Sequence, residues 1–236
     1  MLRPAIPQAY LKHIVSLFPL LAFIAIVPVL SAQAWSHTQV HDAAPLKPPT
    51  GARVAIVEFG DMECPVCARV NPLLMAAAAK YHIPWVRYDF PLSYHVWSFE
   101  ASVDARWFDT KSQKLGDDFR DAVFANQQSI ETQAELRAFA EHFAQLHGIG
   151  FPFVVDPLGK LAAAVKADYA LGQRVGIQHT PTIWVVTNKT TGVPYFDVID
   201  PDLLFEIIDQ AIAETKNEGP APAQPANRAH HHTVSQ

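Results

Sequence analysis

Hydrophobic positions along the chain alternate between short apolar runs and longer stretches with helical spacing, which predicts an α/β domain. A β-branched run at 53–59 predicts a buried strand, and the alanine-rich segment at 65–81 favours a helix. A second apolar run at 84–90, followed by Pro91, predicts another strand. This strand–helix–strand order implies two parallel strands joined by a right-handed crossover.

A long helical stretch follows the second strand. Residues 98–110 and 116–126 each place apolar side chains on one helical face. Residues 132–135 form a capping box that opens a third helix, and Asp156 with Pro157 is expected to start a fourth. The aromatic stripes of these helices predict a packed core rather than a cofactor site.

The C-terminal part of the pattern returns to strands. Apolar runs at 182–186 and 193–198 flank a turn at 188–192, which predicts a β-hairpin. Asp200 and Pro201 then open a final amphipathic helix.

The N-terminal 34 residues have a different composition. Arg3 and Lys12 precede an uncharged apolar run at 14–30, and the small residues of 32–34 form an A-x-A cleavage site. This layout predicts a signal peptide at 1–34 that is removed on export. An uncleaved membrane anchor is the alternative, and it also places the rest of the chain outside the cytoplasm.

The folded domain is expected at 53–216, between a proline-rich linker at 35–52 and a disordered tail at 217–236. Without residues 1–34 the chain has 16 basic residues, because two of the 18 are lost, and it keeps all 23 acidic ones. The resulting formal charge of −7 leaves no basic patch that would suggest a nucleic-acid partner.

The chain has only two cysteines, Cys64 and Cys67, and they form a C-x-x-C motif between the first strand and its helix. Such a pair can close into a disulfide or stand reduced, so it can exchange two electrons. Pro65 suits the first helical turn, and the helix N-terminus stabilises a thiolate at Cys64. Because no other cysteine is available for structural disulfides in an exported protein, we interpret the motif as a redox pair.

The same cysteines could instead hold a soft metal such as Cu(I). That alternative needs a further soft ligand, for which Met62 is a candidate by its position in the sequence, although it could equally make a hydrophobic contact. A zinc site would need a second ligand pair, which the scattered histidines do not supply at the usual spacing. We therefore expect neither a metal nor a cofactor.

Glu58 lies in the middle of the first apolar run, between Val57 and Phe59. A carboxylate in a buried strand is costly unless it is neutral or has a function. A Glu at a strand edge that reaches solvent is the alternative, but the apolar neighbours favour the buried position. His95 and His179 are isolated histidines, and we expect neither to be catalytic, although His179 could contact substrate.

Several features in this order resemble the DsbA-like group of thioredoxin-fold proteins. These are a strand, Cys-Pro-Val-Cys, a helix, a helical insertion, the segment 176–182 opening another strand, a hairpin and a last helix. Residues 90–92 followed by His95 also resemble this group. The resemblance covers about 53–216 and implies a thioredoxin-like fold: a mixed central sheet flanked by helices, with a helical subdomain inserted at about 96–174.

The resemblance also implies an activity, thiol–disulfide exchange with protein thiols. In that family the first cysteine attacks and the second resolves, which corresponds to Cys64 and Cys67, and a buried acid corresponding to Glu58 passes protons to the resolving thiol. A cis peptide corresponding to Thr180 and Pro181 offers its backbone to the substrate. The expected partners are protein thiols or disulfides and a membrane oxidase or reductase that resets the pair.

This sequence departs from the family pattern in two respects. Val66 stands where strongly oxidising members carry histidine, so the Cys64 thiolate is less stabilised and we expect a milder oxidant, tuned by Pro65 and Val66. Residues 35–52 are too short for the dimerisation domain of related isomerases, which predicts a monomer. Together with the N-terminal pattern, the expected location is the periplasm or another export compartment.

Overall fold

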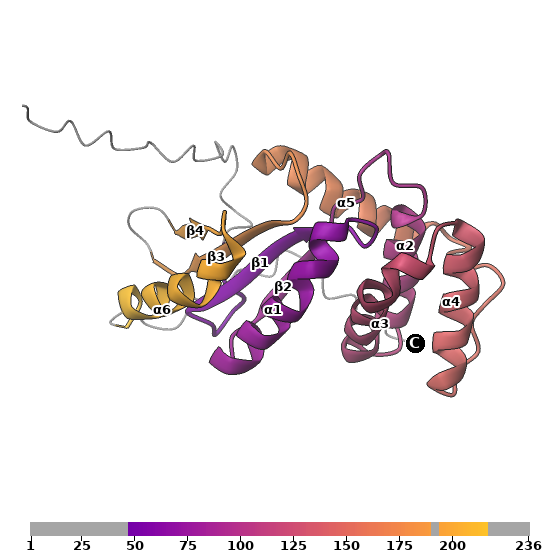
Figure 1. The fold of residues 1–236 in the computed structure, drawn as a ribbon, viewed down its shortest axis with the longest axis horizontal. Coiled ribbons are helices and arrows are strands. Elements are labelled where there is room, and N and C mark those ends of the chain that lie inside the picture. The colour runs from indigo at the N-terminus through magenta and orange to yellow at the C-terminus, as the bar shows by residue number, and fades with distance from the viewer. Residues whose placement is uncertain (1–46, 190–193, 217–236) are drawn as a thin grey trace, which may run out of the picture. The chain divides into compact units, whose positions relative to one another are not determined.

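The computed structural model describes residues 47–189 and 194–216, which fold around a four-stranded mixed sheet (Figure 1). The strands are β1 (Val54–Gly60), β2 (Trp85–Asp89), β3 (Thr182–Thr187) and β4 (Tyr195–Asp197), in the spatial order β2-β1-β3-β4. β1 runs parallel to β2 and antiparallel to β3, and β4 runs antiparallel to β3. The predicted parallel pair and C-terminal strand pair are confirmed, while the turn predicted at 188–192 lies largely outside the described residues.

Helices cover the sheet, and a helical insertion makes up the stretch of chain that joins β2 to β3. α1 (Pro65–Tyr81) joins β1 to β2, and α6 (Leu204–Glu214) follows β4 through a short 3-10 turn, η2 (Pro201–Leu203). The insertion consists of α2 (Ser98–Asp109), α3 (Gln113–Asn126), the 3-10 turn η1 (Gln127–Ser129), α4 (Gln133–Leu146) and α5 (Lys160–Val175). The fold class with a helical subdomain inserted between β2 and β3 is confirmed.

Side chains of β1 alternate between the two faces of the sheet, as the two-residue period of a strand requires. Ile56 packs with apolar residues of α1 and α6, whereas Val57 and Phe59 pack on the other face with residues of α5. The same alternation places Glu58 on the face that α1 covers. The buried acid and the helix that carries the cysteine pair therefore share one side of the sheet.

The helical insertion has an apolar core of its own. Trp97, Phe108 and Phe119 are completely buried there, and the ring centroids of the two phenylalanines are 4.5 Å apart. Burial of each such ring contributes about 2–3 kcal/mol to folding. The predicted aromatic core is confirmed. Met62, from the loop between β1 and α1, packs in the same cluster, so this loop is anchored in the helical subdomain.

The fourth helix of the insertion begins later than the sequence pattern indicates. The prediction of a start at Asp156 and Pro157 is wrong, because α5 begins at Lys160. Gly159 precedes it with φ of 67°, a left-handed conformation that glycine adopts easily. Asp156 Oδ2 accepts a hydrogen bond from Ala162 N at 2.8 Å, so this acid satisfies the first turn from outside the helix. The capping box predicted at 132–135, by contrast, is confirmed.

The predictions for the chain ends concern residues that the structure does not describe: the signal peptide at 1–34, most of the linker at 35–52 and the tail at 217–236. Among the helices within 47–189 and 194–216, none is long and apolar enough to cross a membrane. The cleaved signal peptide and the uncleaved anchor both stay predictions.

Candidate active site

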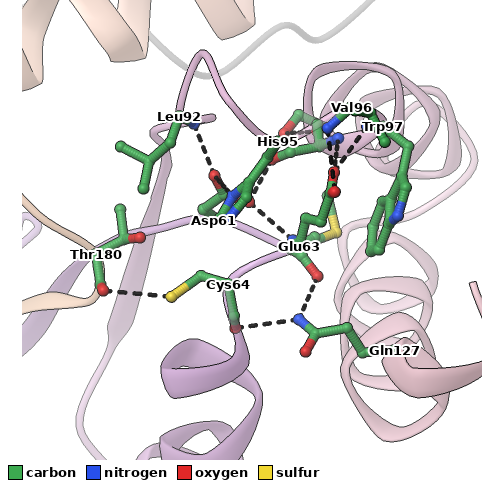
Figure 2. A network of polar contacts seen from close by, with 12 residues as sticks. Asp61, Glu63, Cys64, Leu92, His95, Val96, Trp97, Gln127 and Thr180 are labelled. Carbon is green, nitrogen blue, oxygen red and sulfur yellow. Dashed lines mark hydrogen bonds and ion pairs between the residues drawn. The ribbon is translucent and has the colours of Figure 1, made fainter. Parts of the chain in front are cut away.

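Cys64 occupies the N-cap position of α1, where the loop after β1 turns into the helix. Pro65 follows as the first helical residue, which suits a ring without an N–H. The Cys64 thiol donates a hydrogen bond to the carbonyl oxygen of Thr180 at 3.3 Å (Figure 2). The cysteine thus lies between the start of α1 and the segment that leads into β3.

The peptide bond between Thr180 and Pro181 is cis, as the family resemblance implied. Cys67 lies one turn inside α1 and has no exposed surface, whereas 6% of Cys64 is exposed. Val66, between the two cysteines, is 38% exposed, and its side chain has no polar group that could bond to either sulfur. The structure therefore brings together the two cysteines and the cis-proline turn, which come from opposite ends of the folded domain.

The two cysteines titrate in opposite directions. Hydrogen bonding from the Cys67 thiol is the main cause that lowers the pKa of Cys64 from 9.0 to about 5, and the backbone N–H of Val66 adds to it against the effect of burial. Burial is the main cause that raises the pKa of Cys67, and its proximity to Cys64 and Glu58 raises it further. At neutral pH the reduced pair holds a thiolate on Cys64 and a thiol on Cys67.

Glu58 is buried in the middle of the sheet, with 3% of its surface exposed. The alternative of a strand-edge side chain in solvent is therefore wrong. Trp85 Nε1 donates to Glu58 Oε2 at 3.1 Å, and in the described part of the chain Glu58 Oε1 has no hydrogen-bond partner. Desolvation raises the pKa of Glu58 from 4.5 to about 7, although the charge of Arg87 opposes the rise. A carboxyl group with this pKa can accept and release a proton near neutral pH.

Sequence reasoning did not identify the partners of Glu58 on β2. Arg87 lies opposite Glu58 in the parallel pairing, its guanidinium stacks over the Trp85 ring at 3.6 Å, and it donates to Asp121 at 2.7 Å. Only the register of the two strands places these side chains beside the acid, and a single strand pattern does not reveal that register.

A small cavity of about 20 Å³ lies beside the Glu58 carboxyl group and has room for about one water molecule. Its lining residues are Glu58, Gly60, Met62, Arg87, Tyr88, Asp89, Arg120 and Phe124. A Cβ at position 60 would lie 3.1 Å from Glu58 Oε1, so glycine leaves room for the carboxyl group at this point. Charged side chains of Arg87, Asp89 and Arg120 line this cavity together with the apolar side chains of Met62 and Phe124.

A second polar network, also absent from the sequence predictions, holds the loop before Cys64 (Figure 2). Its centre is the buried carboxylate of Asp61, and Gln127 Nε2 donates to the carbonyl oxygens of Met62 and Cys64 at 2.8 and 3.0 Å. His95 Nδ1 lies 2.7 Å from Asp61 Oδ2, so this histidine belongs to the loop network. Neither a motif nor a periodicity marks Asp61 or Gln127, because their partners are distant in sequence.

The position of Met62 also bears on the copper alternative. Its side chain lies in the apolar cluster of the helical subdomain, which favours the hydrophobic interpretation over that of a metal ligand. Within the described residues, no three His, Cys, Asp or Glu side chains are grouped so that they could hold a metal ion. His179 is exposed at the turn before the cis-proline.

The mixed sheet, the inserted helices and the cysteine pair beside a cis-proline turn define a thioredoxin-like fold of the DsbA-like kind. A family model described as thioredoxin matches residues 49–197, from just before β1 to the end of β4. This match covers more than half of the sequence, and the chain belongs to that thioredoxin family.

Solved structures show the same fold. A variant of Wolbachia pipientis alpha-DsbA1 aligns with a TM-score of 0.60 and 16% identity, over 71% of this chain and 89% of that one. Proteus mirabilis ScsC aligns with a TM-score of 0.52 and 19% identity, over 71% and 73%. A periplasmic thioredoxin-like protein from Salmonella enterica serovar Typhimurium aligns with a TM-score of 0.53 and 17% identity, over 70% and 88%. A search of curated protein sequences finds no match.

Proposed function

We propose that this protein is a thiol–disulfide oxidoreductase that exchanges disulfides with protein thiols through Cys64 and Cys67. The observation that carries the proposal is the contrast between two sulfurs in one motif. Cys64 is the N-cap residue, with 6% of its surface exposed and a pKa lowered to about 5, whereas Cys67 has no exposed surface and a raised pKa. Thiol–disulfide exchange needs both environments. A stabilised thiolate acts as nucleophile or leaving group, and a protected thiol resolves the mixed disulfide.

In the oxidising direction, a substrate thiolate attacks Cys64 Sγ of the enzyme disulfide. The Cys64–Cys67 bond breaks, its electron pair passes to Cys67, and a mixed disulfide forms between substrate and Cys64. Glu58 gives its proton to the emerging Cys67 thiolate. A second substrate thiolate then attacks the substrate sulfur and releases Cys64 as a thiolate, so that the substrate loses two electrons and the enzyme gains them. The reverse sequence reduces a substrate disulfide.

Thr180 and Pro181 supply the surface on which the substrate chain lies next to Cys64. The Thr180 carbonyl oxygen lies 3.3 Å from Cys64 Sγ, so this backbone group faces the sulfur that the substrate must reach. A redox partner protein, a membrane oxidase or reductase, returns the pair to its starting state. Export to the periplasm and a monomeric state complete the proposal; one of the similar structures is that of a periplasmic protein.

Trapping of the mixed disulfide tests the assignment. Cys67→Ser should accumulate a covalent complex with a reduced, cysteine-containing protein under mild oxidation, because no resolving thiol remains. Cys64→Ser should accumulate none, because Cys67 is buried. A complex that forms through Cys67 alone, or with equal yield in both variants, would overturn the proposed roles. Resistance of the trapped complex to reductant would show that its bond is not a disulfide.

A further inference from the structure

Arg87 is the cation that lies opposite Glu58 in the pairing of β1 with β2, yet its guanidinium is bound elsewhere. Its Nη2 donates to Asp121 Oδ1 on α3 at 2.7 Å and to Asn71 Oδ1 on α1 at 3.3 Å. Within the described residues, Glu58 Oε1 has no hydrogen-bond partner. Two helices therefore hold the positive charge that a carboxylate at Glu58 would attract.

Two further contacts fix the position of this guanidinium. Asn71 is 3% exposed, and its Nδ2 donates to Asp121 Oδ1 at 3.1 Å, so the same oxygen accepts from Asn71 and from Arg87. On its other side, Arg87 stacks over the Trp85 ring at 3.6 Å, and Trp85 Nε1 donates to Glu58 Oε2 at 3.1 Å. Asp121 is the anion in this arrangement, and it belongs to the inserted helices.

The other charges near Glu58 have partners of their own. The titratable and charged groups around Glu58 are Arg87, Tyr88 and Asp89 on β2, Cys64 and Cys67 on α1, and Arg120 and Asp121 on α3. Asp89 pairs with Arg106 of α2 at 2.7 Å, and Arg120 donates to both carboxylate oxygens of Asp109 at 2.9 and 2.8 Å. These two charges are neutralised locally, so the pairing of Arg87 decides how much positive charge acts on the acid.

We propose that Asp121 is a positioning residue that holds Arg87 on α3 and thereby keeps Glu58 able to carry a proton near neutral pH. The inference rests on the proposed function and gives the inserted helices a part in proton transfer. An Arg87 side chain released from Asp121 can bind the unpartnered Glu58 oxygen, which favours the ionised carboxylate. Loss of the Asp121 charge acts in the same direction, because a nearby anion opposes ionisation of Glu58.

Titration of Glu58 in the oxidised protein tests the proposal, because the cysteines do not titrate in that state. The infrared absorbance of the protonated carboxyl group reports the midpoint, as the difference between each protein and the same protein with Glu58→Gln. Asp121→Asn should lower the Glu58 midpoint by about one pH unit. Asp121→Glu restores the anion and should return the midpoint to the wild-type value.

Asp118→Asn is the matched control, because it makes the same chemical change on the same helix. Asp118 pairs with Lys114 on the surface, so its replacement should leave the Glu58 midpoint unchanged. An unchanged midpoint in Asp121→Asn would overturn the proposal. Equal shifts in Asp118→Asn and Asp121→Asn would also overturn it, because any lost anion on α3 would then have the same effect.

Arg87→Met separates the positioning of Arg87 from the direct effect of the Asp121 charge. In the Arg87→Met background, Asp121→Asn should shift the Glu58 midpoint by less than half as much as in the wild type. The same shift in both backgrounds would show that Asp121 acts through its own charge, and the positioning role would be wrong.

The pH dependence of peptide oxidation connects the titration with the reaction. With a dithiol peptide as substrate, the inflection of the rate profile should move in Asp121→Asn by the same amount as the infrared midpoint, and a fixed inflection would exclude a part for Asp121 in proton transfer. If the wild type does not oxidise the peptide, the proposed function fails, while the infrared titration still decides whether Asp121 positions Arg87.

A second variant decides if Asp121→Asn does not fold. Asp117 Oδ1 lies 3.7 Å from Arg87 Nη1, and the Asp117 side chain is 41% exposed, so Asp117→Asn is a mild change. It should lower the Glu58 midpoint by a smaller amount, because it loosens the same guanidinium. An unchanged or raised midpoint in Asp117→Asn would then overturn the proposal.

Discussion

Glu58 and Asp61 lie three residues apart, on β1 and the loop that follows it, and both are buried, with 3% and 1% of their surfaces exposed. Their surroundings differ in the number of donors. Glu58 accepts one hydrogen bond, from Trp85, whereas the oxygens of Asp61 are shared among four donors. Burial without donors favours the neutral acid and raises the pKa of Glu58 to about 7.

The comparison shows how two buried acids near one dithiol can have separate roles. A carboxylate saturated with donors holds its partners in place and organises the loop. A carboxyl group with few donors can change its protonation state near neutral pH and transfer protons. In this protein the first environment is that of Asp61, in the loop that precedes Cys64. The second is that of Glu58 on β1, close to Cys67. The predictions below test this separation.

Removing the carboxylate of Asp61 should have the largest effect. Asp61→Ala leaves buried donors without an acceptor, so we expect the free energy of unfolding to fall by about 3–5 kcal/mol. Urea denaturation measures the change. Asp118→Ala is the control, because Asp118 forms a surface pair with Lys114 and its loss should change stability by less than about 1 kcal/mol. A similar, small change in both variants would contradict the structural role of Asp61.

Glu58→Gln should raise the free energy of unfolding at high pH, which is the opposite of the effect expected for Asp61→Ala. The pKa of Glu58 is higher in the folded protein than in the unfolded chain, so the native state binds more protons between about pH 4.5 and 7. Stability of the wild type relative to Glu58→Gln should therefore be greatest below this window and fall by about 3 kcal/mol as the pH rises through it. Denaturation of both proteins across the window measures the difference.

The comparison with the variant is needed because Asp104 and Asp168 are buried acids with raised pKa values as well. Their contributions are present in both proteins and cancel in the difference. A constant difference between wild type and Glu58→Gln would show that Glu58 has an ordinary pKa.

The fold was predictable because a continuous apolar run marks β1, an alanine-rich segment favours the helix α1, and α4 has apolar side chains at helical spacing. The early start predicted for α5 failed because Asp156 and Pro157 have the chemistry of a helix start, while Gly159 sets the actual turn. The Cys64–Cys67 pair and Glu58 could be found because a local pattern marks them.

The partners of these residues could not be found in the same way. The acceptor role of Asp61 depends on donors in residues 92–98, and the environment of Glu58 depends on the register between β1 and β2. Neither relation leaves a local trace in the sequence, because both arise when distant segments pack together. The family resemblance identified Thr180 and Pro181 as site residues, but it identified neither Glu63 nor Gln127.

The proton-transfer role that we propose for Glu58 predicts a kinetic effect. Glu58→Gln should slow thiol–disulfide exchange with a protein substrate by at least about tenfold near neutral pH, because the amide keeps the shape but cannot carry a proton. The pH–rate profile of the wild type should contain an inflection near 7 that the variant lacks. Superimposable profiles would end the proton-transfer interpretation and leave Glu58 with a role in stability alone.

Val66→His should have the smallest effect and concerns the tuning of Cys64. A histidine there can be cationic and donate a hydrogen bond to the Cys64 thiolate, which stabilises the reduced form. We expect the reduction potential to become about 30 mV less negative, which corresponds to roughly 1.4 kcal/mol for two electrons. Equilibration with a glutathione buffer measures it. An unchanged or more negative potential would show that residue 66 does not set the redox balance.

Titration of the reduced protein, followed by the ultraviolet absorbance of the thiolate, tests the central claim most directly. The structure predicts one transition with a midpoint near pH 5, which Cys64→Ser abolishes and Cys67→Ala shifts upward, because alanine removes the thiol donor. Cys67 should show no transition in the same range, since its pKa is raised. A midpoint near 9 in the wild type, or a low midpoint that survives in Cys64→Ser, would contradict the assignment of Cys64 as the reactive thiolate.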